Sequence, residues 1–208
     1  MKYIDLSHEM KNNLNVYPGD PKFSLNEINS IDGKEEYSLF KMSGSLHTGT
    51  HIDAPYHYIP NGKMVSNLDI NKLIGKASIL KVNTEITNKS IKIDDIKMEI
   101  PLKKIVILNT RWYKHWGENN YFNENPYISE ELADLLIENE IFTVAIDTPS
   151  VDKADENIIH KKFLKNDIMI VENLTNMDKL VKNEYFSYFI PMKIAAEASY
   201  IRAFVKDE

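Results

Sequence analysis

The sequence contains no cysteine, although it has 208 residues. Without a thiol the chain can form no disulfide and offers no thiolate nucleophile, and it lacks the sulfur ligands of zinc fingers and iron–sulfur clusters. Any metal site must therefore use nitrogen and oxygen ligands, of which the six histidines are the most informative.

Positive charge is also scarce. Lys and Arg number 25 against 31 Asp and Glu, so the net charge is −6, and arginine occurs only at Arg111 and Arg202. A chain without a basic cluster cannot neutralise phosphates at useful density. Two arginines also leave little for bidentate phosphate recognition. We therefore expect no nucleic-acid partner.

Long hydrophobic runs are missing as well. Apolar stretches such as 105–108 and 168–171 fall far short of the roughly 20 residues that a membrane-spanning helix needs. The opening MKYIDLSHEM becomes polar within a few residues, unlike a signal peptide. We expect a cytoplasmic protein with no membrane partner.

Short apolar segments, rich in β-branched residues and bounded by turn residues, recur along the chain. Such segments favour strands over helices. They lie at 37–43, 77–82, 104–109, 142–147, 167–172, 185–191 and 200–205. The pattern predicts an α/β fold, a single mixed-sheet domain over residues 1–208.

Two helices are expected among these strands. Ser129 precedes two acidic residues, which is typical of a helix N-cap and first turn. Leu132, Leu135 and Leu136 then form one apolar face, and this helix extends to about residue 139. A second helix over 154–164 would join two strands into a βαβ unit with a locally parallel sheet.

Three of the six histidines lie within one segment, HTGTHIDAPYH (47–57). Neutral imidazoles and a carboxylate are the ligands that a divalent metal such as zinc prefers when thiolates are absent. In a straight strand His47 and His51 would stand about 13 Å apart, so binding to one ion requires the backbone to fold back between them. Gly49, one of only seven glycines, permits such a turn.

Asp53 and His57 complete this segment. Asp53 lies two residues beyond His51, so in an extended stretch both side chains share a face. Pro55 biases Ala54 toward extended geometry and places His57 just past the ligands. His57 can then face the cavity from the side opposite His47.

Other candidate residues are interpreted singly. His8 and His115 stand alone, which is more typical of solvated or hydrogen-bonded structural histidines. His160 falls in the expected second helix, and Glu172 closes the run 167–172. An acid at the end of a buried strand is costly unless it is paired or metal-bound. Taken alone, Glu172 also fits a surface carboxylate.

Segment 47–57 matches the signature HxGTHxDxPxH, and the chain resembles the metal-dependent cyclase family, which includes bacterial kynurenine formamidases and isatin hydrolases. Further matching segments follow in the family's order: DLSHEM (5–10), VYPGDPKF (16–23), LNTRWYKHWG (108–117), NPYISEELADLL (125–136), VAIDTPSVD (144–152) and VENLTNM (171–177). DLSHEM resembles the family's opening strand, and the resemblance implies a swivelling β/α barrel-like fold. The sequence departs from the family at AAEASYIRAFV (195–205), where only Arg202 and Ala203 keep the pattern, so the substrate pocket near there is expected to differ.

The resemblance implies a site with two divalent metal ions, zinc first and manganese as the alternative. His47, His51 and Asp53 would hold one ion, and Asp53 would bridge to a second ion, completed by His160 and Glu172. His57 would be the catalytic acid/base and not a ligand; the other interpretation is that it only hydrogen-bonds a ligand.

The implied activity is metal-dependent hydrolysis of a small aryl amide, most specifically of N-formyl-L-kynurenine to formate and L-kynurenine. Two alternatives stay open: an isatin-like cyclic amide or ester hydrolase or cyclase of the same family, or a metal- or ligand-binding protein without turnover. The resemblance also implies a homodimer or homotetramer. Several aromatic side chains could cover an aryl substrate, although each also fits ordinary core packing: Tyr17, Phe23, Tyr56, Tyr58 and Trp112.

Overall fold

A computed structural model describes residues 2–83, 87–98 and 101–207. Its centre is a set of four parallel strands in the order β5 (Ile74–Val82), β8 (Ile105–Asn109), β10 (Thr143–Ile146) and β11 (Met169–Glu172). Their apolar residues alternate between two buried faces, so β8, β10 and β11 are nearly continuous apolar runs. Val106 faces the helices, whereas its neighbours Ile105 and Ile107 face the other side of the sheet.

Antiparallel strands close this sheet into a barrel. Strand β12 (Glu184–Pro191) pairs with β5, and β13 (Ala198–Asp207) pairs with β12. The short β4 (His51–Asp53) pairs with both β11 and β13 and completes the ring. Outside it, β1 (Lys2–Asp5) adds to β13 and β7 (Ile96–Lys97) adds to β5. The α/β mixed-sheet fold and its barrel form are confirmed.

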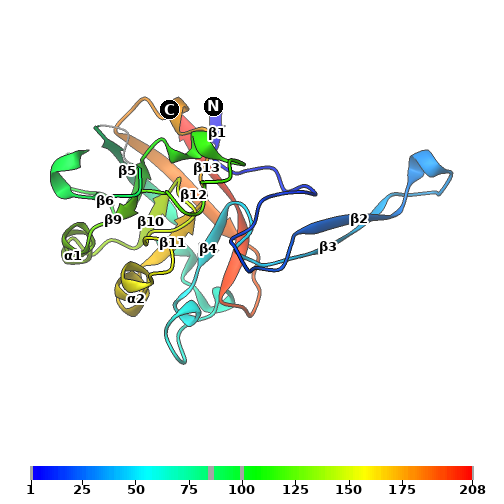
Figure 1. Ribbon diagram of the computed structural model, residues 1–208, viewed down its shortest axis with the longest axis horizontal. Helices are drawn as coiled ribbons and strands as arrows, with labels where there is room; N and C mark the ends of the chain where they lie inside the picture. The colour runs from blue at the N-terminus through cyan, green and yellow to red at the C-terminus, as the bar shows by residue number, and fades with distance from the viewer. Residues whose placement is uncertain (1, 84–86, 99–100, 208) are drawn as a thin grey trace.

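The helices lie together on one flank of the barrel (Figure 1). Helix α1 (Glu130–Glu138) packs against α2 (Ile158–Lys165), and α2 packs against β11. Nearby, β6 (Ser90–Ile91) pairs with β9 (Tyr127–Ile128). None of the helices that the structure describes is long and apolar enough to cross a membrane.

Helix α1 starts as predicted, because the Ser129 hydroxyl accepts a hydrogen bond from the backbone N–H of Leu132 at 3.2 Å. The start predicted for the second helix, residue 154, is wrong. Asp155 has a left-handed φ of +64°, which interrupts a helix at that point. The Asp152 carboxylate accepts hydrogen bonds from the N–H groups of Ile159 and His160, so the first helical turn forms there.

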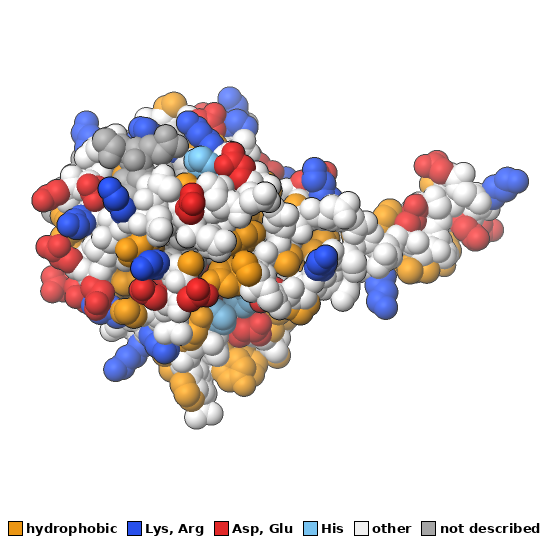
Figure 2. Space-filling view, viewed as in Figure 1, with side chains coloured by type: hydrophobic (Ala, Val, Ile, Leu, Met, Phe, Trp, Pro, Cys, Tyr) orange, Lys and Arg blue, Asp and Glu red, His pale blue; other side chains and the backbone are white. Residues whose placement is uncertain are grey.

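A two-stranded hairpin, β2 (Ser24–Asn29) with β3 (Leu39–Ser43), projects far from the barrel (Figures 1 and 2). All residues of β3 are exposed. The strand predicted at 37–43 therefore exists from residue 39 onward, but it belongs to this arm. The opening strand expected over 5–10 lies earlier, at Lys2–Asp5.

Candidate metal centre

The turn predicted at Gly49 brings His47 back to His51. Gly49 has a φ of +66°, and the two imidazole centroids lie 5.0 Å apart. A Cβ at Gly49 would lie 2.6 Å from the sulfur of Met10. The predicted turn is confirmed, and its positive φ favours glycine; the neighbour that an added Cβ would meet is the flexible side chain of Met10.

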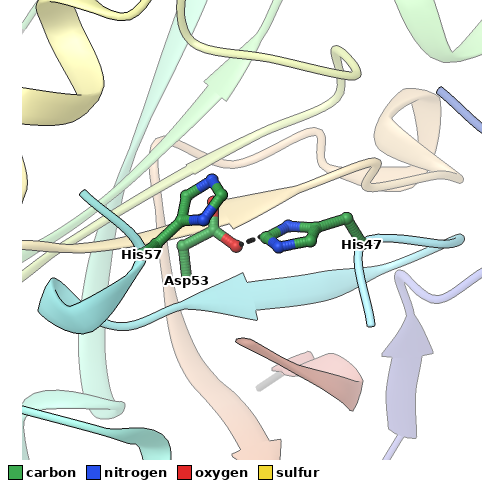
Figure 3. Close-up of side chains that lie close together, drawn as sticks. All are labelled: His47, Asp53 and His57. Carbon is green, nitrogen blue, oxygen red and sulfur yellow. Dashed lines mark ion pairs between the residues drawn. The ribbon is translucent and has the colours of Figure 1, made fainter. Parts of the chain in front are cut away.

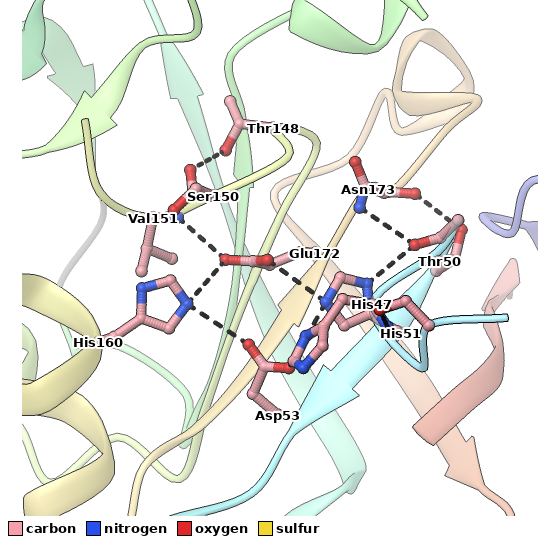
Figure 4. A network of polar contacts seen from close by, with 12 residues as sticks. His47, Thr50, His51, Asp53, Thr148, Ser150, Val151, His160, Glu172 and Asn173 are labelled. Atoms are coloured by element: carbon pink, nitrogen blue, oxygen red, sulfur yellow. Dashed lines mark hydrogen bonds and ion pairs between the residues drawn. The ribbon is translucent and has the colours of Figure 1, made fainter. Parts of the chain in front are cut away.

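Asp53 is fully buried on β4 and lies between three histidines (Figure 4). Its Oδ1 is 3.1 Å from Nδ1 of His47 and 3.5 Å from Nε2 of His51. Its Oδ2 is 3.4 Å from Nε2 of His160. The two carboxylate oxygens thus face different histidines, which is the arrangement that a bridging ligand requires.

Glu172 ends β11 beside β4, where its register partner is His51. One carboxylate oxygen lies 3.4 Å from Nε2 of His51, and the other lies 3.3 Å from Nε2 of His160. The backbone N–H of Val151 donates a hydrogen bond to Glu172 at 3.0 Å. Glu172 is a buried side chain of the cluster, and its alternative interpretation as a surface carboxylate is wrong.

Burial and charge oppose each other throughout this cluster. Burial disfavours a charged His47, but the carboxylates of Asp53 and Glu197 outweigh it and raise the pKa of His47 to about 10. Burial likewise disfavours a charged Asp53, yet His47 and His51 hold the Asp53 pKa well below its usual range. The buried carboxylates therefore need positive charge beside them, whether from protons or from a cation.

The donor atoms also fit a metal. Within the described part of the chain, Nε2 of His51 and both carboxylate oxygens of Asp53 are buried without a hydrogen-bond partner. Buried polar groups are rarely left unpaired. Donor atoms of His51, Asp53 and Glu172 all lie within 4.8 Å of one another. Imidazole nitrogens and carboxylate oxygens at this spacing suit zinc or manganese.

His57 lies next to His47 in the cluster, and its approach to the cavity from the side opposite His47 stays a prediction. The two ring centroids are 4.4 Å apart, and both rings flank Asp53 (Figure 3). After Pro55 the chain makes a 3-10 turn, in which the N–H of His57 donates to the carbonyl of Ala54 at 2.9 Å. This turn returns the ring over the cluster.

The surroundings of His57 favour its neutral form. Burial, and then the neighbouring histidines, lower its pKa to about 4 against the opposing pull of Asp53. His57 therefore differs from His47, whose pKa the carboxylates raise.

The cluster opens into a cavity of about 350 Å³. Tyr17 and Tyr58 line it as expected, together with Phe122, whose ring meets Tyr17 edge to face at 5.9 Å. The other predicted aromatic residues do not line it: Phe23 and Trp112 are buried in the core, and Tyr56 is exposed outside it. Phe122 carries no sequence signal that separates it from a core aromatic residue.

His8 and His115 lie outside the cluster, as expected. His8 stacks on Trp116 with ring centroids 3.8 Å apart, and burial lowers its pKa to about 4. His115 faces Glu118 at 2.8 Å. Both histidines therefore make local structural contacts outside the cluster.

Sequence reasoning missed the residues that hold the predicted ligands. Asp152 accepts two backbone hydrogen bonds at the start of α2 and lies 2.7 Å from Nδ1 of His160. Asn173 donates to the carbonyl of Gly49 at 3.1 Å, and that carbonyl faces Nδ1 of His51. The only signal for either was its place within the segments 144–152 and 171–177.

A closed α/β barrel with a buried histidine–carboxylate cluster defines a class of protein suited to binding divalent metals. The family model described as "Putative cyclase" matches residues 4–153. Kynurenine formamidase of Bacillus mycoides (strain KBAB4) is 31% identical over 209 residues, covering 99% of this chain and 97% of the relative. Kynurenine formamidase of Bacillus anthracis is 30% identical with the same coverage. The chain belongs to the putative cyclase family, and the resemblance found in its sequence is confirmed.

Solved structures share the fold. Isatin hydrolase A from Labrenzia aggregata bound to benzyl benzoate superposes with a TM-score of 0.85 at 22% identity, covering 98% of this chain and 93% of that one. A structure described as a potential metal-dependent hydrolase with cyclase activity gives a TM-score of 0.81 at 23% identity, covering 100% and 99%. At these identities the likeness establishes the fold alone.

Proposed function

We propose that this protein is a metal-dependent amidohydrolase that converts N-formyl-L-kynurenine to formate and L-kynurenine. The observation that carries the proposal is Asp53, whose two buried oxygens face His47, His51 and His160 without a hydrogen-bond partner among the described residues. The choice of substrate is based on the relatives that are named kynurenine formamidase.

Two divalent ions, zinc or manganese, would be held by the predicted residues. His47, His51 and Asp53 would bind the first, and Asp53, His160 and Glu172 would bind the second. When bound, such ions lower the pKa of a coordinated water and polarise a carbonyl oxygen.

His57 is proposed as the acid/base. Its neutral imidazole can accept a proton from the attacking water and return it to the aniline nitrogen that leaves the formyl carbon. Its donor atom also lies within 4.8 Å of those of His47 and Asp53, so a ligand role is the competing assignment. Measuring metal content and turnover on the same variant separates the two.

The cavity would position the aryl ring. Tyr17, Tyr58 and Phe122 present aromatic surfaces beside the cluster, which suit an aromatic substrate. Packing of the ring against them would hold the formyl group over the cluster and reduce the access of bulk water.

A substrate panel tests this function. The purified protein is loaded with zinc or with manganese and assayed with N-formyl-L-kynurenine, isatin and an aryl ester. Preference for the formamide supports the proposal, and preference for isatin or the ester favours the cyclic amide or ester hydrolase of the same family. Two bound ions per chain without turnover of any substrate would instead indicate a binding protein.

We also propose an oligomeric state, a domain organisation and a cellular location. We expect a homodimer or homotetramer, because the arm formed by β2 and β3 exposes Phe40 and Met42 and an isolated two-stranded hairpin is marginally stable in water. Residues 1–208 would fold as one domain, since β4 pairs with the distant β11 and β13. A cytoplasmic location and the absence of nucleic-acid and membrane partners stay predictions.

A further inference from the structure

Two of the three histidines around Asp53 point the same ring nitrogen toward it. His160 places Nε2 3.4 Å from Asp53, and its Nδ1 lies 2.7 Å from the carboxylate of Asp152. His51 places Nε2 3.5 Å from Asp53, and its Nδ1 lies 2.9 Å from the carbonyl oxygen of Gly49. In both residues an oxygen outside the centre faces the nitrogen that points away from it.

His47 has the reverse orientation. Its Nδ1 lies 3.1 Å from Asp53, whereas Nε2 points outward and lies 3.7 Å from Oε1 of Glu197. Glu197 belongs to the segment 195–205, in which the sequence departs from the family pattern. Glu197 is the acidic residue of that segment. Its carboxylate lies beside the outer nitrogen of His47, as the Asp152 carboxylate does for His160 and the Gly49 carbonyl does for His51.

The backbone holds Glu197 close to the centre. Its carbonyl oxygen accepts a hydrogen bond from the N–H of Ala54 at 2.8 Å. The next residue, Ala198, is the register partner of Asp53 between β13 and β4. The carbonyl of Ala196 accepts from the N–H of Val65 at 2.9 Å. The chain on both sides of Glu197 is therefore fixed relative to Asp53.

A neutral imidazole carries its proton on one nitrogen and its lone pair on the other. An acceptor beside the outer nitrogen keeps the proton there, which leaves the inner lone pair for a metal and fixes the orientation of the ring. We propose that Glu197 is the positioning residue of His47: it holds the Nε2 proton and directs Nδ1 toward the cluster. This inference rests on the proposed metal centre.

Exposure makes this contact the weakest of the three. The Glu197 side chain is 38% exposed, against 2% for Asp152, so water competes for the carboxylate. The separation of 3.7 Å is also longer than that of the other two contacts. An ion held by His47 would therefore be lost more easily than one held by His160.

The test compares Glu197→Ala and Glu197→Gln with the wild type, all loaded with zinc. The release of zinc to a chelating indicator is followed in time, and ¹⁵N spectra of the histidine rings report which nitrogen of His47 carries the proton. Glutamine keeps an oxygen that can accept from Nε2. Glu118→Ala is the matched control, because Glu118 also faces a histidine, His115, but lies outside the cavity.

We expect Glu197→Ala to release one of the two ions about 10- to 100-fold faster, the usual effect of removing such a partner. Glu197→Gln should restore most of the retention, and the Glu118 control should match the wild type. The wild type should show the His47 proton on Nε2. Wild-type release rates in Glu197→Ala, or a proton on Nδ1, would overturn the positioning role while leaving the metal centre intact. A wild type that retains no zinc would overturn the metal centre and this inference with it.

Discussion

His51 and Glu172 are register partners on the antiparallel strands β4 and β11, and Nε2 of His51 lies 3.4 Å from Oε2 of Glu172. This pairing joins the segment 47–57 to the C-terminal half of the chain. Helix α2, which carries His160, connects β10 to the parallel strand β11. The pairing of β11 with β4 therefore also brings His160 to the cluster. The site therefore depends on the closure of the barrel.

The shared position of Asp53 predicts how metal content responds to substitution. Asp53→Ala should lose both ions, because each carboxylate oxygen faces a different part of the cluster. Glu172→Ala should lose chiefly one. Elemental analysis of purified proteins checks both results. A wild type with a single ion, together with unchanged content in Glu172→Ala, would contradict the two-metal arrangement.

His57→Asn separates catalysis from metal binding. If His57 transfers protons, turnover should fall by roughly 10²- to 10⁴-fold, the usual scale of general acid–base catalysis, while metal content stays near normal. Turnover and metal content are measured on the same sample. Loss of metal would identify His57 as a ligand instead, and normal turnover would remove it from the reaction.

Gly49→Ala should impair metal retention. The substitution places a Cβ 2.6 Å from the sulfur of Met10 and imposes a φ of +66° on a residue that disfavours it. Displacement of the turn should move His47 relative to His51. Gly117→Ala is the control, because Gly117 also has a positive φ but no neighbour within 4 Å of an added Cβ. Equal metal retention in the two variants would show that neither the φ of Gly49 nor its contact with Met10 controls the metal site.

Asp147 predicts a pH dependence of stability. Burial raises its pKa from 3.8 to about 6, although Thr110 donates hydrogen bonds to it. Between these values the unfolded chain has released the proton and the folded chain still holds it. The free energy of unfolding therefore falls by about 3 kcal/mol as the pH rises through this window, and the contribution of Asp147 is smallest above pH 6.

Denaturant unfolding of the wild type and Asp147→Asn at pH 4, 5, 6 and 7 measures this contribution. The free energy of unfolding of the wild type, relative to that of the variant, should fall between pH 4 and 6 and then level off. A difference that is constant, or that rises with pH, would show that the folded-state pKa is not raised.

The arm predicts an effect on assembly. Phe40 and Met42 lie on one face of β3, and Lys41 lies on the other. Phe40→Ser with Met42→Ser should shift the protein toward the monomer in light scattering coupled to gel filtration, whereas Lys41→Ser should not. A wild type that is monomeric at micromolar concentration would contradict a role of the arm in self-association.

Features that depend on neighbouring residues could be predicted from the sequence. The turn at Gly49, the cap at Ser129 and the parallel pairing of β10 with β11 follow from local conformational preferences and from hydrophobic patterns. The signature at 47–57 also identified the family, and the family pattern implied a ligand set whose members the structure brings together.

Hydrogen bonds within loops and contacts between distant segments set the remaining features. The side from which His57 approaches follows from the 3-10 turn after Pro55, and the start of α2 follows from the hydrogen bonds of Asp152. The position of Glu197 beside His47 exists because β13 pairs with β4. Strand pairing across the barrel is set by the packing of the whole chain, so no local pattern could place these side chains next to one another.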